Sequence, residues 1–171
     1  MNWDRYTTEG QKFIDKEKET AALVADHYAV DIQFATFDAE KFDAYIYKTP
    51  NIVSGICEIK TRPYFNRKLK IPCTLDKLTK EGYLITAEKL YILQAQSRIY
   101  NVYSYIFVNL PNDKKILCFK VCDKEGEFLI DFETDWTPTL YSCNDYKGDT
   151  TRLNAFLPIK NNVNFEYFDY R

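Results

Sequence analysis

The segment Phe42-Asp43-Ala44-Tyr45-Ile46-Tyr47, followed after a short turn by Ile56-Cys57-Glu58-Ile59-Lys60-Thr61-Arg62, decides how the rest of the chain is interpreted. Both segments are rich in aromatic and β-branched residues, which favours strands. The connection contains Thr49-Pro50-Asn51, and proline suits the first corner of a type I or type II turn. Together these features predict an antiparallel β-hairpin.

This hairpin brings two carboxylates to opposite positions. Side chains alternate along a strand, so Glu58 and Lys60 share one face of the second segment. With the turn centred between Pro50 and Asn51, Asp43 faces Glu58 with the β-carbons roughly 5 Å apart, a spacing at which like charges are destabilising. Two explanations remain open. Either the register shifts at a bulge marked by Gly55, or a cation lies between the carboxylates.

Length and composition favour a single α/β domain over residues 1–171. The chain is 46% hydrophobic and 28% charged, and one hydrophobic core is usual at this length. It contains no apolar run near the about 18 residues of a membrane span and no signal-peptide pattern, so we expect a cytoplasmic protein without membrane contact. The net charge of −2 argues against wrapping nucleic acid over the whole surface but permits a local basic footprint.

Hydrophobic periodicity predicts a helix before the hairpin and another after it. Residues 8–28 carry apolar side chains at helical spacing, and residues 87–100 do so behind Thr86, which is placed to cap the helix. Strands are predicted over 30–37, in both segments of the hairpin, over 102–110 and over 115–122. A helix between strands indicates a crossover and some parallel pairing in a mixed sheet.

The remaining segments are expected to be short or irregular. Residues 75–80 predict a short helical turn, and residues 127–132 predict a further strand. Residues 134–151 are polar and turn-rich and are expected to be irregular, whereas residues 154–170 are expected to pack back on the core. The five cysteines have no framework spacing, and no zinc site is expected from them. Cys57, Cys118 and Cys122 lie in apolar runs and are predicted to be reduced core residues.

Polar side chains fall on the apolar faces of both predicted helices. Glu17 lies near the centre of the apolar arc of the first helix, and Gln96 and Lys89 lie on the inward arc of the second. An ionised carboxylate there is costly unless it is paired or ligates a metal. Glu17 therefore pairs with a core cation, lies at the edge of the arc, or joins a metal site. Gln96 either bonds the sheet backbone or reaches such a site.

A basic and aromatic stretch follows the second segment of the hairpin. Residues 60–70 carry five positive charges and no negative charge. A solvated loop explains this composition, and so does a surface that contacts phosphates. The position directly after Glu58 and Lys60 favours the second interpretation.

The arrangement of Asp43, Glu58 and Lys60 suits metal-assisted cleavage of a phosphodiester bond. Carboxylates hold a hard divalent cation through oxygen, and the cation lowers the pKa of a bound water and neutralises charge on the phosphate. A neighbouring lysine orients that water and stabilises the developing charge. Other acid-x-lysine sequences occur at Asp113–Lys115 and Asp145–Lys147, but both lie in polar turn sequence.

Phe42-Asp43 and Glu58-Ile59-Lys60 resemble the signature of the PD-(D/E)xK nuclease superfamily, and the resemblance covers about residues 8–110. It implies an α/β fold with a restriction-endonuclease-like αβββαβ core, a mixed central sheet and flanking helices. We expect this core over about 8–122 and an irregular C-terminal extension over about 123–171. The chain departs from the pattern in having Phe42 where the superfamily name has proline.

The resemblance also implies roles for individual residues. Asp43 and Glu58 would ligate Mg²⁺ or Mn²⁺, with the Ile59 carbonyl and Glu17 as further ligands. Lys60 would position the attacking water. Gln96-Ser-Arg-Ile-Tyr100 matches a Gln-x-x-x-Tyr pattern of some members, and Gln96 would hold the water or Lys60. Contacts with nucleic acid are implied for Arg62, Tyr64, Phe65, Arg67, Lys68, Lys70 and Tyr100.

The expected function is therefore a divalent-metal-dependent DNA nuclease, either a small endonuclease or a Holliday-junction-resolvase-like enzyme. A resolvase needs two active sites and hence a homodimer. One alternative is a catalytically inactive nuclease-fold module that binds nucleic acid or a protein partner. Another is an unrelated α/β binding protein in which Glu58 and Lys60 form only an ion pair.

Overall fold

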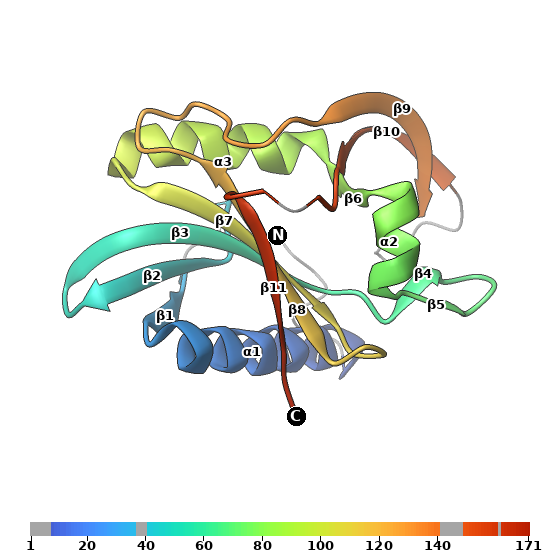
Figure 1. Cartoon of the computed structure of the whole chain (residues 1–171), viewed down its shortest axis with the longest axis horizontal. Helices are drawn as coiled ribbons and strands as arrows, with labels where there is room; N and C mark the ends of the chain where they lie inside the picture. The colour runs from blue at the N-terminus through green and yellow to red at the C-terminus, as the bar shows by residue number, and fades with distance from the viewer. Residues whose placement is uncertain (1–7, 37–40, 141–148, 161) are drawn as a thin grey trace.

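A computed structural model describes residues 8–36, 41–140, 149–160 and 162–171. These residues form three helices, a six-stranded sheet, a three-stranded sheet and a two-stranded sheet (Figure 1). The elements are α1 (Thr8–Tyr28), β1 (Asp31–Phe34), β2 (Ala44–Thr49), β3 (Ile52–Thr61), β4 (Tyr64–Asn66), β5 (Ile71–Pro72), α2 (Leu75–Glu81), β6 (Tyr83–Thr86), α3 (Ala87–Tyr100), β7 (Tyr103–Leu110), β8 (Lys115–Cys122), β9 (Glu133–Leu140), β10 (Asp149–Leu157) and β11 (Phe165–Asp169). None of the described helices is long and apolar enough to cross a membrane.

The central sheet is mixed, as the crossover predicted. Its strand order is β1-β2-β3-β7-β8-β11, and β3 and β7 run parallel while its other neighbours run antiparallel. The chain reaches β7 from β3 by way of α2, β6 and α3. Helix α1 covers one face of the sheet and α3 covers the other (Figure 1). The result is a three-layer α/β arrangement.

Both predicted long helices are confirmed, and Thr86 is the N-cap residue of α3 as predicted. Its side chain, however, makes no capping hydrogen bond. Pairing with a strand holds Thr86 instead, because Thr86 is also the last residue of β6 and pairs with Asn154 of β10. The helix ends at Asn101, whose left-handed backbone (φ 54°) lets its N–H bond the carbonyl of Ser97.

The register of the β2–β3 hairpin is retained at the carboxylates. Ala44 pairs with Cys57, and the Asp43 N–H donates to the Cys57 carbonyl at 3.1 Å, so Asp43 and Glu58 are the next facing positions. The bulge lies farther along, where Ser54 is the extra residue beside Gly55. The Ser54 hydroxyl satisfies two backbone groups of β2 there, each at 3.0 Å. A register shift therefore does not separate the two acids.

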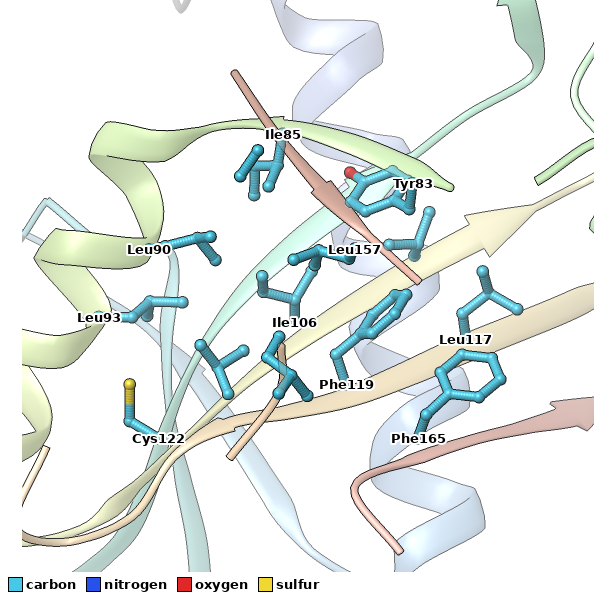
Figure 2. Close-up of a cluster of buried hydrophobic side chains, with 14 of the residues drawn as sticks. Tyr83, Ile85, Leu90, Leu93, Ile106, Leu117, Phe119, Cys122, Leu157 and Phe165 are labelled. Atoms are coloured by element: carbon cyan, nitrogen blue, oxygen red, sulfur yellow. The ribbon is translucent and has the colours of Figure 1, made fainter. Parts of the chain in front are cut away.

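The core has two parts, one on each face of the central sheet. The larger part lies between the sheet, α3 and the second sheet, and Leu90, Ile106, Phe119 and Leu157 meet in it (Figure 2). The smaller part lies against α1. Cysteines at positions 57, 73, 118 and 122 are buried free thiols, which agrees with the prediction for Cys57, Cys118 and Cys122. Cys143 lies outside the described residues.

The expectation of an irregular C-terminal extension is wrong. Strand β10 pairs with β6 and β9, and β11 pairs with β8 at the edge of the central sheet. Ala155 and Leu157 are fully buried, so this part of the chain completes the core. The polar composition of β9 hid the strand because much of β9 is exposed and an exposed strand lacks an apolar signal. Residues 141–148 lie outside the described residues.

The predicted strand over 127–132 is also wrong. Its described contact with a strand is an isolated bridge between Phe128 and Cys122. Phe128, Ile130 and Phe132 pack on the larger core without a ladder. Their apolar pattern indicates that these side chains are buried, but it does not show that the segment pairs with a neighbouring strand.

Candidate functional site

Asp43, Glu58 and Lys60 meet where β2 begins and β3 nears its end. The Lys60 ammonium lies 3.2 Å from Asp43 Oδ2 and 3.2 Å from Glu58 Oε1. The N–H of Ile59 also donates to Asp43 Oδ2, at 2.7 Å. A cation between the carboxylates was one of the two explanations for their opposition. In this structure the ammonium of Lys60 takes that place.

Glu58 carries a charge inside the fold. Its side chain is only 1% exposed, and a second ammonium, from Lys89 of α3, lies 2.8 Å from its Oε1. Both lysines meet Oε1 at ion-pair distance without hydrogen-bond geometry, and none of the described residues donates to the buried Oε2. Burying a carboxylate is costly unless it is compensated. Two lysines provide that compensation and leave one oxygen without a partner.

Glu17 belongs to the same electrostatic cluster. It lies half-buried on α1. Burial, followed by repulsion from Asp43, raises the pKa of Glu17 from 4.5 to about 7, although Lys60 acts in the opposite direction. Burial lowers the pKa of Lys60, but attraction from Glu58, Asp43 and Glu17 outweighs burial and raises it above its ordinary value. The cluster thus favours a charged lysine and a glutamate that titrates near neutrality.

Helix α3 reaches the cluster through Lys89. The sequence placed both Lys89 and Gln96 on the inward arc of this helix, and only Gln96 was given a role. Gln96 lies about two turns farther along α3, in the wall of a pocket that also contains Tyr91 and Trp136. The role of Gln96 in the cluster remains a prediction. Lys89 was missed, although its position on the inward arc was a usable signal.

The basic stretch forms a hairpin that leaves the sheet directly after the cluster. We call residues 62–72 the basic hairpin, which contains β4 and β5 (Figure 1). Leu69 is 71% exposed at its turn, where the side chain of Asn66 accepts a hydrogen bond from the Leu69 N–H. The exposed residues also include Tyr64, Phe65, Arg67, Lys68 and Lys70. These side chains are placed to meet a partner.

Several predicted nucleic-acid contacts also touch other parts of the protein. The Arg67 guanidinium lies 5.6 Å from the centroid of the Phe13 ring, and the Lys77 ammonium lies 5.5 Å from that of Phe65. The Arg62 guanidinium lies over the ring of Tyr83, 5.7 Å from its centroid. The Tyr100 hydroxyl is 2.9 Å from that of Tyr45, and its ring packs edge-on against Phe42. Arg62 and Tyr100 therefore support the fold around the cluster.

A metal ion at the cluster would find oxygen ligands. Within the described ranges, no group of three or more histidine, cysteine, aspartate or glutamate side chains is arranged to hold an ion by itself. Asp43, Glu58 with its unpartnered Oε2, and the peptide group of Ile59 form a smaller set. Mg²⁺ commonly uses one or two carboxylates and completes its coordination with water and substrate phosphates. The residues fit an ion that shares its coordination in this way.

Comparisons with known proteins give no relative. The chain matches no family model, and it has no match among curated proteins or among solved structures.

Proposed function

We propose that this protein is a divalent-metal-dependent nuclease that hydrolyses phosphodiester bonds in DNA. The observation that carries the proposal is the buried Glu58 carboxylate with an oxygen that lacks a partner, in the position facing Asp43 and bridged to it by Lys60. A buried acceptor without a donor is unfavourable. A bound cation would supply the missing partner.

The order of elements supports the same proposal. Leaving out β4, β5, α2 and β6, which lie between β3 and α3, the order is α1, β1, β2, β3, α3 and β7, with β7 parallel to β3. The resemblance to the PD-(D/E)xK superfamily implies this order for a restriction-endonuclease-like core. Asp43 directly precedes the second strand of this series, and Glu58 lies in the third.

In this proposal Asp43, Glu58 and the Ile59 carbonyl hold Mg²⁺ or Mn²⁺, and Glu17 contributes when ionised. The bound ion lowers the pKa of a water and offsets charge on the phosphate. Lys60 orients the attacking water and stabilises negative charge in the transition state. Lys89 keeps the buried Glu58 ionised. The basic hairpin contacts the phosphate backbone of the substrate, with Tyr64 and Phe65 available for stacking.

A binding module without catalytic activity is the second candidate. The observation that favours it is the pair of ammonium groups at Glu58, which compensates the buried charge without a metal. In that case Asp43, Glu58, Lys60 and Lys89 form a structural ion network. The two candidates differ in one respect that can be measured, which is the dependence of activity and stability on a divalent cation.

The test is cleavage of end-labelled DNA in single-stranded, duplex, flapped and four-way-branched forms, with Mg²⁺ or Mn²⁺ and with chelator. We expect metal-dependent cleavage of one or more of these forms. Glu58→Gln and Lys60→Met should each abolish cleavage, because each removes a charge of the cluster. Both substitutions preserve the size of the side chain. Asp76→Asn is the matched control, since Asp76 is an exposed acid of α2 paired with Lys80.

A wild-type protein that cleaves none of these forms would leave the binding module as the better account. Cleavage that persists in Glu58→Gln would show that the active centre lies elsewhere. Sedimentation of the active protein with a four-way junction tests the homodimer that resolvase activity requires.

A further inference from the structure

A large pocket lies between α3 and the β9–β10 pair. Its volume is about 790 Å³. One wall comes from α3, with Tyr91 and Gln96, and the other comes from β9 and β10, with Trp136 and Arg152. These elements lie side by side along the upper edge of Figure 1. None of these residues except Gln96 had a role in the expected site.

Two aromatic rings in this pocket are unusually exposed. Trp136 is 67% exposed and Tyr91 is 47% exposed, although tryptophan is on average a highly buried residue. Trp136 faces Leu153 across the β9–β10 pair, and Tyr91 rests edge-on against Phe128 at 6.2 Å between centroids. Each ring is thus supported from one side. Exposed rings offer π-faces on which a planar ligand can stack.

The charged side chains of the pocket favour an anionic ligand. Lys41 and Arg152 carry positive charge, and Glu88 is the single acid among those lining residues that the structure describes. Guanidinium groups suit both phosphate binding and stacking on flat rings. Rings and cations in one pocket match a ligand with a planar base and a phosphate.

The pocket also adjoins the carboxylate cluster. Lys41 lines its mouth, and the Lys41 carbonyl accepts from the Lys89 ammonium at 3.5 Å. That same ammonium lies 2.8 Å from Glu58 Oε1. A strand with a phosphate at the cluster therefore has this pocket beside it.

We propose that the pocket binds one unpaired nucleotide of the nucleic-acid strand next to the bond that is cleaved. The base stacks between Trp136 and Tyr91, and Lys41 and Arg152 hold its phosphate. The position of this nucleotide beside the cleaved bond rests on the nuclease activity proposed above. A paired base cannot enter a pocket without leaving the helix, and extrusion costs least where pairing is already absent. The preferred substrate is then single-stranded DNA or DNA with an unpaired segment at the cleavage point.

Tryptophan fluorescence tests this directly and without cleavage. The chain contains two tryptophans, so Trp3→Phe leaves Trp136 as the single reporter. The full-length Trp3→Phe protein is titrated in chelator with an eight-nucleotide oligothymidylate and with an abasic octamer of equal charge. We expect oligothymidylate to quench Trp136 and to bind about 5- to 150-fold more tightly than the abasic octamer, which is the range for base–aromatic stacking.

Variants locate the contact. In the same background Tyr91→Ala should weaken binding of oligothymidylate by a similar factor and leave binding of the abasic octamer unchanged. Tyr167→Ala on β11 is the matched control, because Tyr167 is 46% exposed and Tyr91 is 47% exposed. We expect Tyr167→Ala to bind both octamers as the parent does.

The outcomes separate this inference from the nuclease proposal. Equal quenching by both octamers, or loss of oligothymidylate binding in Tyr167→Ala alone, overturns the nucleotide pocket. A protein that cleaves DNA but shows no quenching also overturns the pocket and leaves the nuclease standing. Quenching by oligothymidylate in a protein that cleaves nothing supports the pocket and rejects the nuclease.

Discussion

Substitution of Glu17 by glutamine should stabilise the protein at alkaline pH and leave it unchanged at acidic pH. The folded state raises the pKa of Glu17 from 4.5 to about 7, so folding favours the protonated carboxyl. The stability that this group contributes is complete below its unfolded pKa. It is lost as the pH rises through the folded pKa, because the native state must then bury a charge. Glutamine resembles the protonated carboxyl and does not titrate.

The size of the effect follows from the shift. Each pKa unit corresponds to 1.36 kcal/mol, so the change from 4.5 to about 7 corresponds to about 3.4 kcal/mol. Solvent screening of the half-buried side chain reduces this figure to about 2 kcal/mol. For a urea m-value of about 2 kcal/mol/M, the unfolding midpoint of Glu17→Gln should exceed that of the wild type by about 1 M at pH 8.5.

The assay is urea unfolding at pH 5 and pH 8.5 in chelator, which removes divalent cations that would favour the ionised form. Glu19→Gln is the matched control, since Glu19 is an exposed glutamate of the same helix. Because pH 5 lies just above the unfolded pKa of 4.5, we expect the advantage of Glu17→Gln over Glu19→Gln to be about a quarter as large at pH 5 as at pH 8.5. An equal gain at both pH values would refute the reasoning. Lower stability of Glu17→Gln at pH 8.5 would mean that attraction to Lys60 outweighs burial.

Three further predictions concern the cluster and the basic hairpin. Mn²⁺ at 100 times its dissociation constant should raise the free energy of unfolding by about 2.7 kcal/mol. For a chain of this size this is a rise in Tm of about 5–10 °C. Calorimetry should show no such rise in the Asp43→Asn protein. Lys89→Met should lower the free energy of unfolding in urea by about 1–3 kcal/mol, because it removes one of the two positive charges that compensate Glu58. Adding Glu58→Gln to the Lys89→Met protein should restore most of that loss. Fully additive effects of the two substitutions would contradict the ion pair. Removing the charges of Arg67 and Lys68 together should lower the slope of log binding constant against log salt concentration by about 2 for duplex DNA. An unchanged slope would exclude the basic hairpin from the DNA contact.

Helices and strands that bury one face show how much of the fold can be predicted from the sequence. Helices α1 and α3 and strands β7 and β8 lie where periodicity predicted them, because burial of one face imposes a period on the sequence. Strand β10 escaped prediction because its pairing with β6 joins residues far apart in the sequence, and β9, which pairs with β10, is largely exposed and lacks an apolar pattern. Residues 127–132 failed for the opposite reason, since an apolar run can be buried without a partner strand.

For the candidate site, the alternation of side chains and the short turn predicted that Asp43 faces Glu58, since both act locally. They left open a register shift at Gly55, and the register of the β2–β3 pair in the structure removes that alternative. The inward position of Glu17 followed in the same way from helical period. Which cation lies between the two acids was beyond local reasoning.

That Lys60 and Lys89 supply the positive charge at Glu58 follows from the tertiary structure. Those contacts depend on how α3 packs against β3, which is a distance in space between segments far apart in the chain. The pocket with Trp136 has the same origin, because its two walls come from α3 and from β9 and β10. Periodicity in the sequence predicts which face of a helix or strand a residue lies on. Which side chains it contacts depends on how those faces pack together in the folded protein.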